Sequence, residues 1–156
     1  MVLYAVKKNE YNRLNVFVGI SFFSDAEAGY AISLQNENGE VTLPASRYSK
    51  SKNGKLNYDT ICFIALIRTL EEICKSKETN RCLEINYYSG SDMLSFSWEK
   101  EYKRNGVIGR SDISETEWKN LIRIVNMNNI HLNIIGSKSM FEFAAATEKR
   151  RVIHEC

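Results

Sequence analysis

The sequence predicts an α/β domain built on a five-stranded mixed sheet flanked by helices, with the strand order 3-2-1-4-5. Three apolar, β-branched stretches separated by turn signals fill the first third of the chain, which indicates an antiparallel meander. Two later stretches of this kind alternate with segments whose apolar residues recur at helical spacing, which indicates parallel strands joined by helical crossovers. Such crossovers are right-handed, and this handedness leads to the predicted strand order.

The first strands follow one another closely. A short strand is expected within residues 2–6, and Leu14–Phe23 is an apolar run typical of a strand in the middle of a sheet. Gly29–Leu34 forms the second strand of the meander and Glu40–Ala45 the third. Asn38 and Gly39 between them favour a tight hairpin, because both residues tolerate a positive φ. The one proline, Pro44, falls in a loop-like stretch.

A long amphipathic helix follows a polar loop. Its expected core face carries apolar side chains at helical spacing, and its opposite face is charged. From this periodicity and that of a later helix, we expect burial of Phe63, Ile67, Leu70, Trp118 and Ile122.

The remaining elements alternate between strand and helix. Cys82–Tyr88 alternates as a fourth strand, and a helix from about Ser91 to Arg104 should stop at Asn105-Gly106. Ser114–Glu117 has the pattern of a capping box and opens the next helix. A fifth strand at Ile130–Ile135 and a last helix from about Met140 complete the domain.

The composition is that of an ordinary globular protein. The 156 residues contain no internal repeat or linker, so we expect a single domain over 1–156. Apolar residues make up 44% of the chain and charged residues 26%. No apolar run approaches the roughly 20 residues of a membrane helix, and the first residues do not resemble a secretory signal. We therefore expect a cytoplasmic protein with no membrane partner.

Cysteine and histidine give no sign of a metal site or a cofactor. The cysteines form no CxxC pair, and the histidines are far from each other and from most cysteines. His154 stands two residues from Cys156, but two ligands do not make a metal site. Scattered thiols of this kind are typical of a reducing compartment. The residues concerned are Cys62, Cys74, Cys82, Cys156, His131 and His154.

Basic residues gather in three stretches, although the formal net charge is only +2. One lies between Arg47 and Tyr58, one between Lys100 and Arg110, and one covers residues 149–151. Each could be an ordinary solvated face, but three on one domain raise the possibility of nucleic-acid contact.

Several segments, together with the order of the elements, resemble cellular ribonuclease H. Gly54–Tyr58 leads into the long helix as the polar loop of that family does, and Ser97–Gly106 is similar to its helix and basic protrusion. Ile130–Gly136 is similar to its final strand and to the glycine that opens its histidine loop. The resemblance covers most of the chain from about Leu14 onward and implies the ribonuclease H-like fold.

The resemblance also implies where a catalytic centre would lie. In the family, four carboxylates and a histidine loop hold two magnesium ions at the scissile phosphodiester. The matched positions here carry no such groups, so the comparison implies a pseudoenzyme with no catalytic residue and no bound metal. In chain order these positions are Gly19, Cys62 or Ile61, Tyr87 or Tyr88, and Thr147, with Ser137 in place of the loop histidine.

Three functions remain open from the sequence. The first is an inactive domain that binds nucleic acid or acts as a scaffold, with A-form RNA–DNA hybrid or double-stranded RNA as its partner. The second is a protein-binding module, for example an inhibitor from a mobile element. The third is a divergent nuclease whose ligands have moved to Asp25, Asp59, Asp92 and Glu142.

For nucleic-acid binding, the resemblance indicates phosphate contacts from basic residues and an aromatic contact. Trp98 matches an aromatic residue that lines the DNA channel in cellular ribonucleases H, although it could equally be a helix residue packed on the sheet. The expected contact residues are Trp98, Lys103, Arg104, Arg110 and Lys138.

Overall fold

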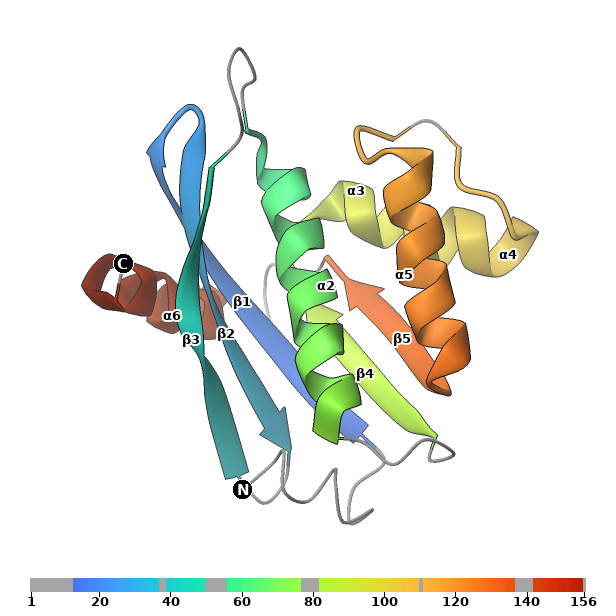
Figure 1. Ribbon diagram of the computed structural model, residues 1–156, viewed down its shortest axis with the longest axis horizontal. Coiled ribbons are helices and arrows are strands. Elements are labelled where there is room, and N and C mark those ends of the chain that lie inside the picture. The colour runs from blue at the N-terminus through green and yellow to red at the C-terminus, as the bar shows by residue number, and fades with distance from the viewer. Residues whose placement is uncertain are drawn as a thin grey trace.

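A five-stranded mixed sheet in the order β3-β2-β1-β4-β5 forms the centre of the computed structural model (Figure 1). The structure describes residues 13–36, 39–49, 56–76, 82–109, 111–136 and 142–155, without the side chains of 142–147. The predicted strand within residues 2–6 and Asn38 of the predicted turn lie outside these ranges. The strands are β1 (Arg13–Ser24), β2 (Glu27–Asn36), β3 (Gly39–Ser49), β4 (Leu83–Tyr88) and β5 (Ile130–Ile135).

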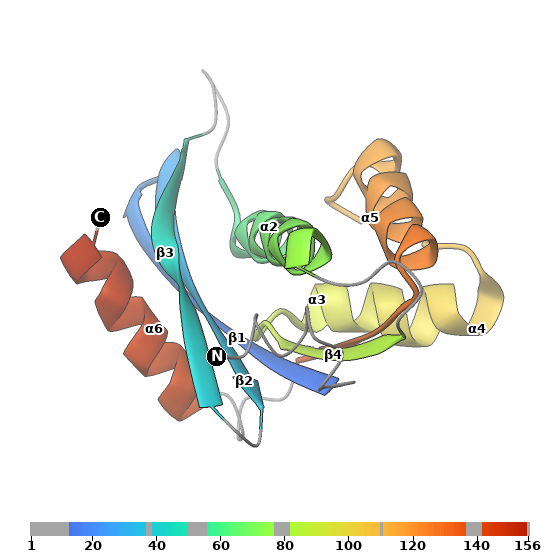
Figure 2. The same ribbon diagram turned by 60° about the horizontal axis from the view of Figure 1, so that its bottom comes forward.

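The strand pairing confirms the predicted mixed sheet. β1 and β2, like β2 and β3, are antiparallel, whereas β1 with β4 and β4 with β5 are parallel. One face of the sheet is covered by α2, α5 and the helical segment that contains α3, η1 and α4, and the other by α6 (Figure 2). The helices are α2 (Tyr58–Ser76), α3 (Asp92–Ser95), η1 (Phe96–Tyr102), α4 (Lys103–Asn105), α5 (Glu115–Met127) and α6 (Glu142–Glu155). Among the described residues, no helix is both long and apolar enough to cross a membrane.

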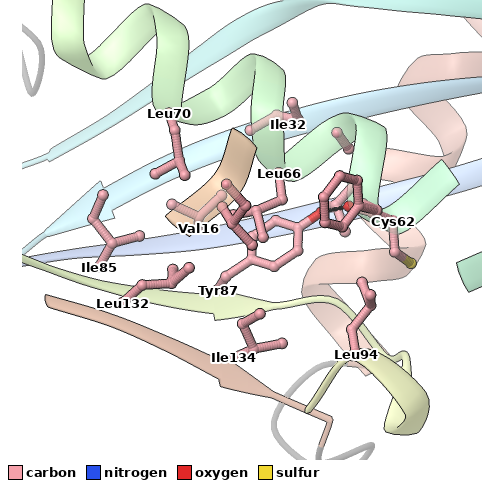
Figure 3. Close-up of a cluster of buried hydrophobic side chains, with 14 of the residues drawn as sticks. Val16, Ile32, Cys62, Leu66, Leu70, Ile85, Tyr87, Leu94, Leu132 and Ile134 are labelled. Carbon is pink, nitrogen blue, oxygen red and sulfur yellow. Dashed lines mark hydrogen bonds between the residues drawn. The ribbon is translucent and has the colours of Figure 1, made fainter. Parts of the chain in front are cut away.

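The main core lies between α2 and the sheet. Leu66 and Leu70 of α2 point at Val16 of β1, and side chains of β2, β4 and β5 close the cluster (Figure 3). Phe63, Leu70 and Trp118 are buried as predicted. Ile67 and Ile122 are only partly buried, which corrects the prediction. They line hollows on the two sides of α5, where no other element covers them fully.

β3 continues four residues beyond its predicted end and contains Pro44, which corrects the prediction of a loop there. Tyr30 pairs with Ser46 and Ile32 with Leu43, so two residues of β3 lie opposite one residue of β2. This irregularity is a β-bulge, and β3 is the edge strand of the sheet. Proline has no N–H to donate to the ladder, and a bulge on an edge strand is a position where that donor is not required.

α6 supplies side chains to the backbone around the bulge. The Arg151 guanidinium donates to the carbonyl oxygens of Ile32, at 3.2 Å, and Leu43, at 2.6 Å. A carboxylate oxygen of Glu155 accepts the N–H of Ala45 at 3.2 Å and also binds Arg151. Backbone groups at the bulge are thus bonded by α6, which fixes this helix to the β3 edge.

The predicted helix after β4 is present, but its middle is a π-helix. Ser91 caps it by accepting the Leu94 N–H, and it stops at Gly106, whose φ of 72° is left-handed, as predicted. Between these ends, residues 96–102 are wound as η1, which corrects the expectation of a plain α-helix. A π-helix places more residues in each turn and changes which side chains share a face.

The helical segment 92–105 bonds the outer edge of β5. The Ser95 hydroxyl donates to the Ile134 carbonyl at 2.9 Å, and a Glu99 carboxylate oxygen accepts the Ile134 N–H at 3.1 Å. The Trp98 indole N–H donates to the Leu132 carbonyl at 2.8 Å. Backbone groups that an edge strand would otherwise leave unpaired are therefore satisfied by side chains.

Arg151→Ala should destabilise the fold by about 3 kcal/mol, because it leaves Glu148 buried without its ionic partner. The exposed neighbour provides a matched control, and Arg150→Ala should change the free energy of unfolding by no more than about 0.5 kcal/mol. Urea unfolding monitored by circular dichroism measures both. Equal effects of the two substitutions would show that the Arg151 contacts do not stabilise the fold.

Candidate site at the matched catalytic positions

Gly19 of β1 lies directly under the backbone of α6. A Cβ atom at this position would stand 2.2 Å from the Lys149 nitrogen and 2.5 Å from the Glu148 carbonyl carbon. Both distances are far below any van der Waals contact, so no side chain can occupy this position while α6 stays in place. The position that the resemblance matched to the first carboxylate is therefore filled by helix backbone.

The strand register distinguishes the two tyrosines that the sequence left open. Val16 stands beside Tyr87, and Phe17 stands beside Tyr88. Because side chains alternate along a strand, Gly19 and Tyr88 share the face covered by α6, whereas Tyr87 points toward α2. Tyr88 is therefore on the same face as Gly19, and Tyr87 is on the face of Cys62. The Tyr88 ring stacks on Phe17, with centroids 4.8 Å apart.

Tyr87 fills the interior on the other face. It is fully buried, and its hydroxyl donates to the Cys62 carbonyl at 2.7 Å (Figure 3). The Cys62 thiol and the Tyr58 hydroxyl both donate to the Ser89 carbonyl, at 3.3 and 3.0 Å. Tyr58 and Cys62 of α2 thus both contact the backbone directly after β4.

The ionisable side chains of this cluster are weaker acids than usual. Burial is the main cause that raises the pKa of Cys62, of Tyr58 and of Tyr87. All three groups are neutral near pH 7, so the cluster consists of neutral hydrogen-bonding groups and carries no negative charge to attract a cation.

Glu148 is the acid next to Gly19, and its side chain is 2% exposed. It forms an ion pair with Arg151. Burial raises the pKa of Glu148, and the hydrogen bond from Arg151 opposes that rise. The carboxylate nearest to the matched site is thus engaged by a neighbour on its own helix. The side chain of Thr147, the matched fourth position, lies outside the described part, as does Ser137.

These residues do not fit a two-magnesium centre. Magnesium requires oxygen ligands in near-octahedral geometry, whereas Gly19, Cys62 and Tyr88 offer no side chain, a thiol and a stacked phenol. Over the described ranges, no group of three or more His, Cys, Asp and Glu residues is placed to hold a metal ion.

Two acids of the relocated-site hypothesis, Asp59 and Asp92, are connected through Ser91. Asp59 accepts a 2.6 Å hydrogen bond from the Ser91 hydroxyl, and Asp92 lies beside Gly136. Asp25 is exposed at the turn between β1 and β2, and the side chain of Glu142 is not described.

Of the residues expected to contact nucleic acid, Trp98 is placed in the core. It is 2% exposed, stacks on Tyr102 with centroids 4.7 Å apart, and donates its N–H to β5. A base cannot reach this ring, so the expected aromatic contact is corrected to a packing role.

The basic residues expected to contact nucleic acid differ in their surroundings. The Lys103 ammonium binds Glu99 at 2.9 Å and the Asn133 side-chain oxygen at 2.6 Å, while Arg104 is exposed one residue later. Arg110 and Lys138 lie outside the described residues.

The sequence analysis missed two exposed aromatic residues. Phe22 and Phe23 were assigned to a buried strand, but they are 42% and 41% exposed at the end of β1. The Arg47 guanidinium lies 4.4 Å above the centre of the Phe23 ring. The adjacent turn signal at Ser24-Asp25 was the available clue, because a strand end projects beyond the helices that cover its centre.

Comparison with solved structures shows a ribonuclease H-like fold. A ribonuclease H1 isolated from compost by a metagenomic approach, LC11-RNase H1, has a TM-score of 0.58 at 15% identity, over 93% of this chain and 96% of that one. The same enzyme in complex with an RNA/DNA hybrid gives a TM-score of 0.61 at 16% identity, with 90% and 94% covered. The protease–reverse transcriptase of prototype foamy virus gives 0.56 at 13% identity, where the match covers 92% of this chain but 20% of that polypeptide. No family model and no curated protein sequence matches the chain.

Gly19→Ala should lower the free energy of unfolding by about 3 kcal/mol, because α6 has to move away to admit the new methyl group. Gly39→Ala is the control, since a Cβ at Gly39 meets no described atom within 4 Å. Chemical denaturation of both variants tests this prediction. A Gly19→Ala variant as stable as the wild type would mean that α6 does not pack on β1 as described.

Cys62 should react far more slowly with iodoacetamide than Cys82 near neutral pH. Cys62 is buried with a raised pKa, whereas Cys82 is exposed and provides an internal control. Mass spectrometry of peptides after timed alkylation of the native protein measures both rates. Similar rates at the two cysteines would contradict the described packing around Cys62.

Proposed function

We propose that this chain is a catalytically inactive ribonuclease H-like domain that binds nucleic acid and acts as a binding or scaffold module. The observation that carries the proposal is the close approach of the α6 backbone to Gly19. An active enzyme of this fold needs a carboxylate where α6 leaves no space. The stacked pair of Phe17 and Tyr88 fills the neighbouring position with aromatic carbon instead of ligand oxygen.

Nucleic acid is the proposed partner for two reasons. A solved structure of similar fold, LC11-RNase H1, binds an RNA/DNA hybrid. In addition, Lys100 and Arg104 are exposed on the helical segment that ends at Asn105. We expect phosphate contacts here, made by Arg104 and by Lys103 after release from Glu99. Such contacts position a duplex without reading its sequence.

Protein binding is the second candidate, and a cavity supports it. A hollow of about 540 Å³ lies between α5 and the loop that follows α4, with Tyr102, Ile108 and Trp118 in its lining. Val107 at its rim is 68% exposed. An apolar side chain of a partner protein could occupy this hollow, as expected of an inhibitor or accessory factor.

Metal-dependent cleavage and binding, measured on the same preparations, test the proposal. With Mg²⁺ or Mn²⁺ we expect no cleavage of RNA–DNA hybrid, double-stranded RNA or single strands. Turnover that is abolished by Asp59→Asn or Asp92→Asn would overturn the inactive assignment and favour relocated ligands.

Binding to the hybrid should be weak and should fall steeply with salt as counterions are released. Lys103→Ala with Arg104→Ala should reduce the slope of log affinity against log salt by about 0.9 for each phosphate that the variant no longer neutralises. The matched control is Lys119→Ala with Arg123→Ala, which removes the same charge from α5. If the wild type binds no nucleic acid at low salt, the protein-binding function replaces this one.

A further inference from the structure

A second basic and aromatic surface lies on the opposite side of the sheet from the segment 92–105. It is formed by the exposed side of α6, the end of the β1–β2 hairpin and Arg47 of the adjacent strand β3, and we call it the α6–hairpin surface. Figure 2 shows α6 crossing beneath β1, β2 and β3, away from α2 and α5. Its residues are Phe23, Arg47, Lys149, Arg150 and Ile153.

Close packing at Gly29 joins the two parts of this surface. A Cβ at Gly29 would stand 2.6 Å from a methyl carbon of Val152 and 3.1 Å from the Phe23 ring, so the ring lies beside α6. Arg47 lies over that ring and forms an ion pair with Glu27, and Glu27 also accepts a hydrogen bond from Ser49. The guanidinium is therefore held in a defined place above the aromatic ring, while its side chain remains 47% exposed.

The α6–hairpin surface carries more positive than negative charge that is free of a partner within the described part of the chain. Lys149 and Arg150 are exposed, and within the described part of the chain neither makes a hydrogen bond or an ion pair. The nearby acids Glu27 and Glu155 are already bonded to arginines. Among the described acids of the hairpin and of α6, Asp25 at the turn is the one without such a partner. Two cations are thus available to bind an external anion.

Apolar area accompanies these cations. Ile153 is 61% exposed and lies one helical turn after Lys149, on the same side of α6. Phe22 and Phe23 add two partly exposed rings at the hairpin end. Cations next to flat, exposed side chains match a ligand that combines phosphates with unpaired bases.

We propose that the α6–hairpin surface binds a single-stranded segment of nucleic acid. Lys149 and Arg150 contact successive phosphates, and a base stacks on the Arg47 guanidinium that Phe23 supports. Guanidinium planes and aromatic rings are the platforms on which proteins stack unpaired bases. An acidic peptide would match the charge but would leave this platform unused. The proposal rests on the proposed nucleic-acid-binding function and names a second surface for it.

The test uses the full chain and a fluorescently labelled oligouridine, with binding measured by anisotropy over a range of salt. Lys149→Ala with Arg150→Ala should weaken binding about tenfold at low salt and reduce the salt slope by about 1.4, which corresponds to two single-strand phosphate contacts. Phe23→Leu keeps an apolar side chain beside Val152 but removes the ring, and should weaken binding about tenfold with little change in slope. Lys119→Ala with Arg123→Ala is the charge-matched control on α5 and should leave binding within about twofold of the wild type.

Four results would overturn the proposal. Equal weakening by the α6 pair and the α5 pair would mean that binding follows overall charge. Binding of polyglutamate as tight as that of oligouridine would identify an acidic-polymer surface. Loss of oligouridine binding in Lys103→Ala with Arg104→Ala, without an effect of the α6 pair, would place the single strand on the other side of the sheet and leave the proposed function intact. A wild type that binds neither oligouridine nor hybrid would reject both.

Discussion

The close approach of α6 to β1 is the constraint on which the rest of this face depends. A helix packed on a sheet is normally held away by the side chains of the strand beneath it. Here Gly19 allows the backbone of residues 148 and 149 to lie against the strand, and Gly29 on the adjacent strand admits Val152. The helix therefore lies low across the sheet. This depth buries Glu148 and allows Arg151 and Glu155 to reach the backbone at the β3 bulge.

The same close packing links the fold to the chemistry that the site can perform. A carboxylate at position 19 and α6 in its present place exclude each other on steric grounds. Any exchange of glycine for a metal ligand would have to raise the helix, and raising it would break the bonds of Arg151 to Ile32 and Leu43. Under the proposed match, the last helix occupies space in which ions would sit, and the aromatic pair at Phe17 and Tyr88 fills the neighbouring position. An apolar filling is the stable alternative, because a polar hollow without ligands is costly.

Much of the fold could be predicted, because its determinants are local. Periodicity indicated the order of elements and the five strands, and the Ser114 hydroxyl does accept the Glu117 N–H at 3.2 Å, as its capping pattern indicated. The errors arose where a distant partner decides the outcome. Pro44 stays in a strand because that strand is at the edge and α6 bonds its neighbours. The π-turn at residues 96–102 places Trp98 and Glu99 against β5, an arrangement that no spacing within the helix reveals. The resemblance indicated Gly19 as a matched position without an acid, but no local pattern could reveal that the backbone of a helix more than 120 residues away in sequence packs against it.

Side chains bond part of each edge of the sheet, and this limits how the domain can meet a partner. Segment 92–105 bonds the backbone of β5, and the Pro44 bulge with α6 interrupts β3. Addition of a strand from another chain along β5 or across the β3 bulge would require one of these covers to leave, because backbone groups there are already bonded. Helix surfaces and loops are the parts of the domain that remain open to a partner without such a change. The exposed cations lie on such helix surfaces. Arg104 is near the end of segment 92–105, and Lys149 and Arg150 are on α6. Because these groups lie on opposite sides of the sheet, one straight duplex cannot contact both at once. The proposed duplex and the proposed single strand would therefore bind on different sides of the sheet.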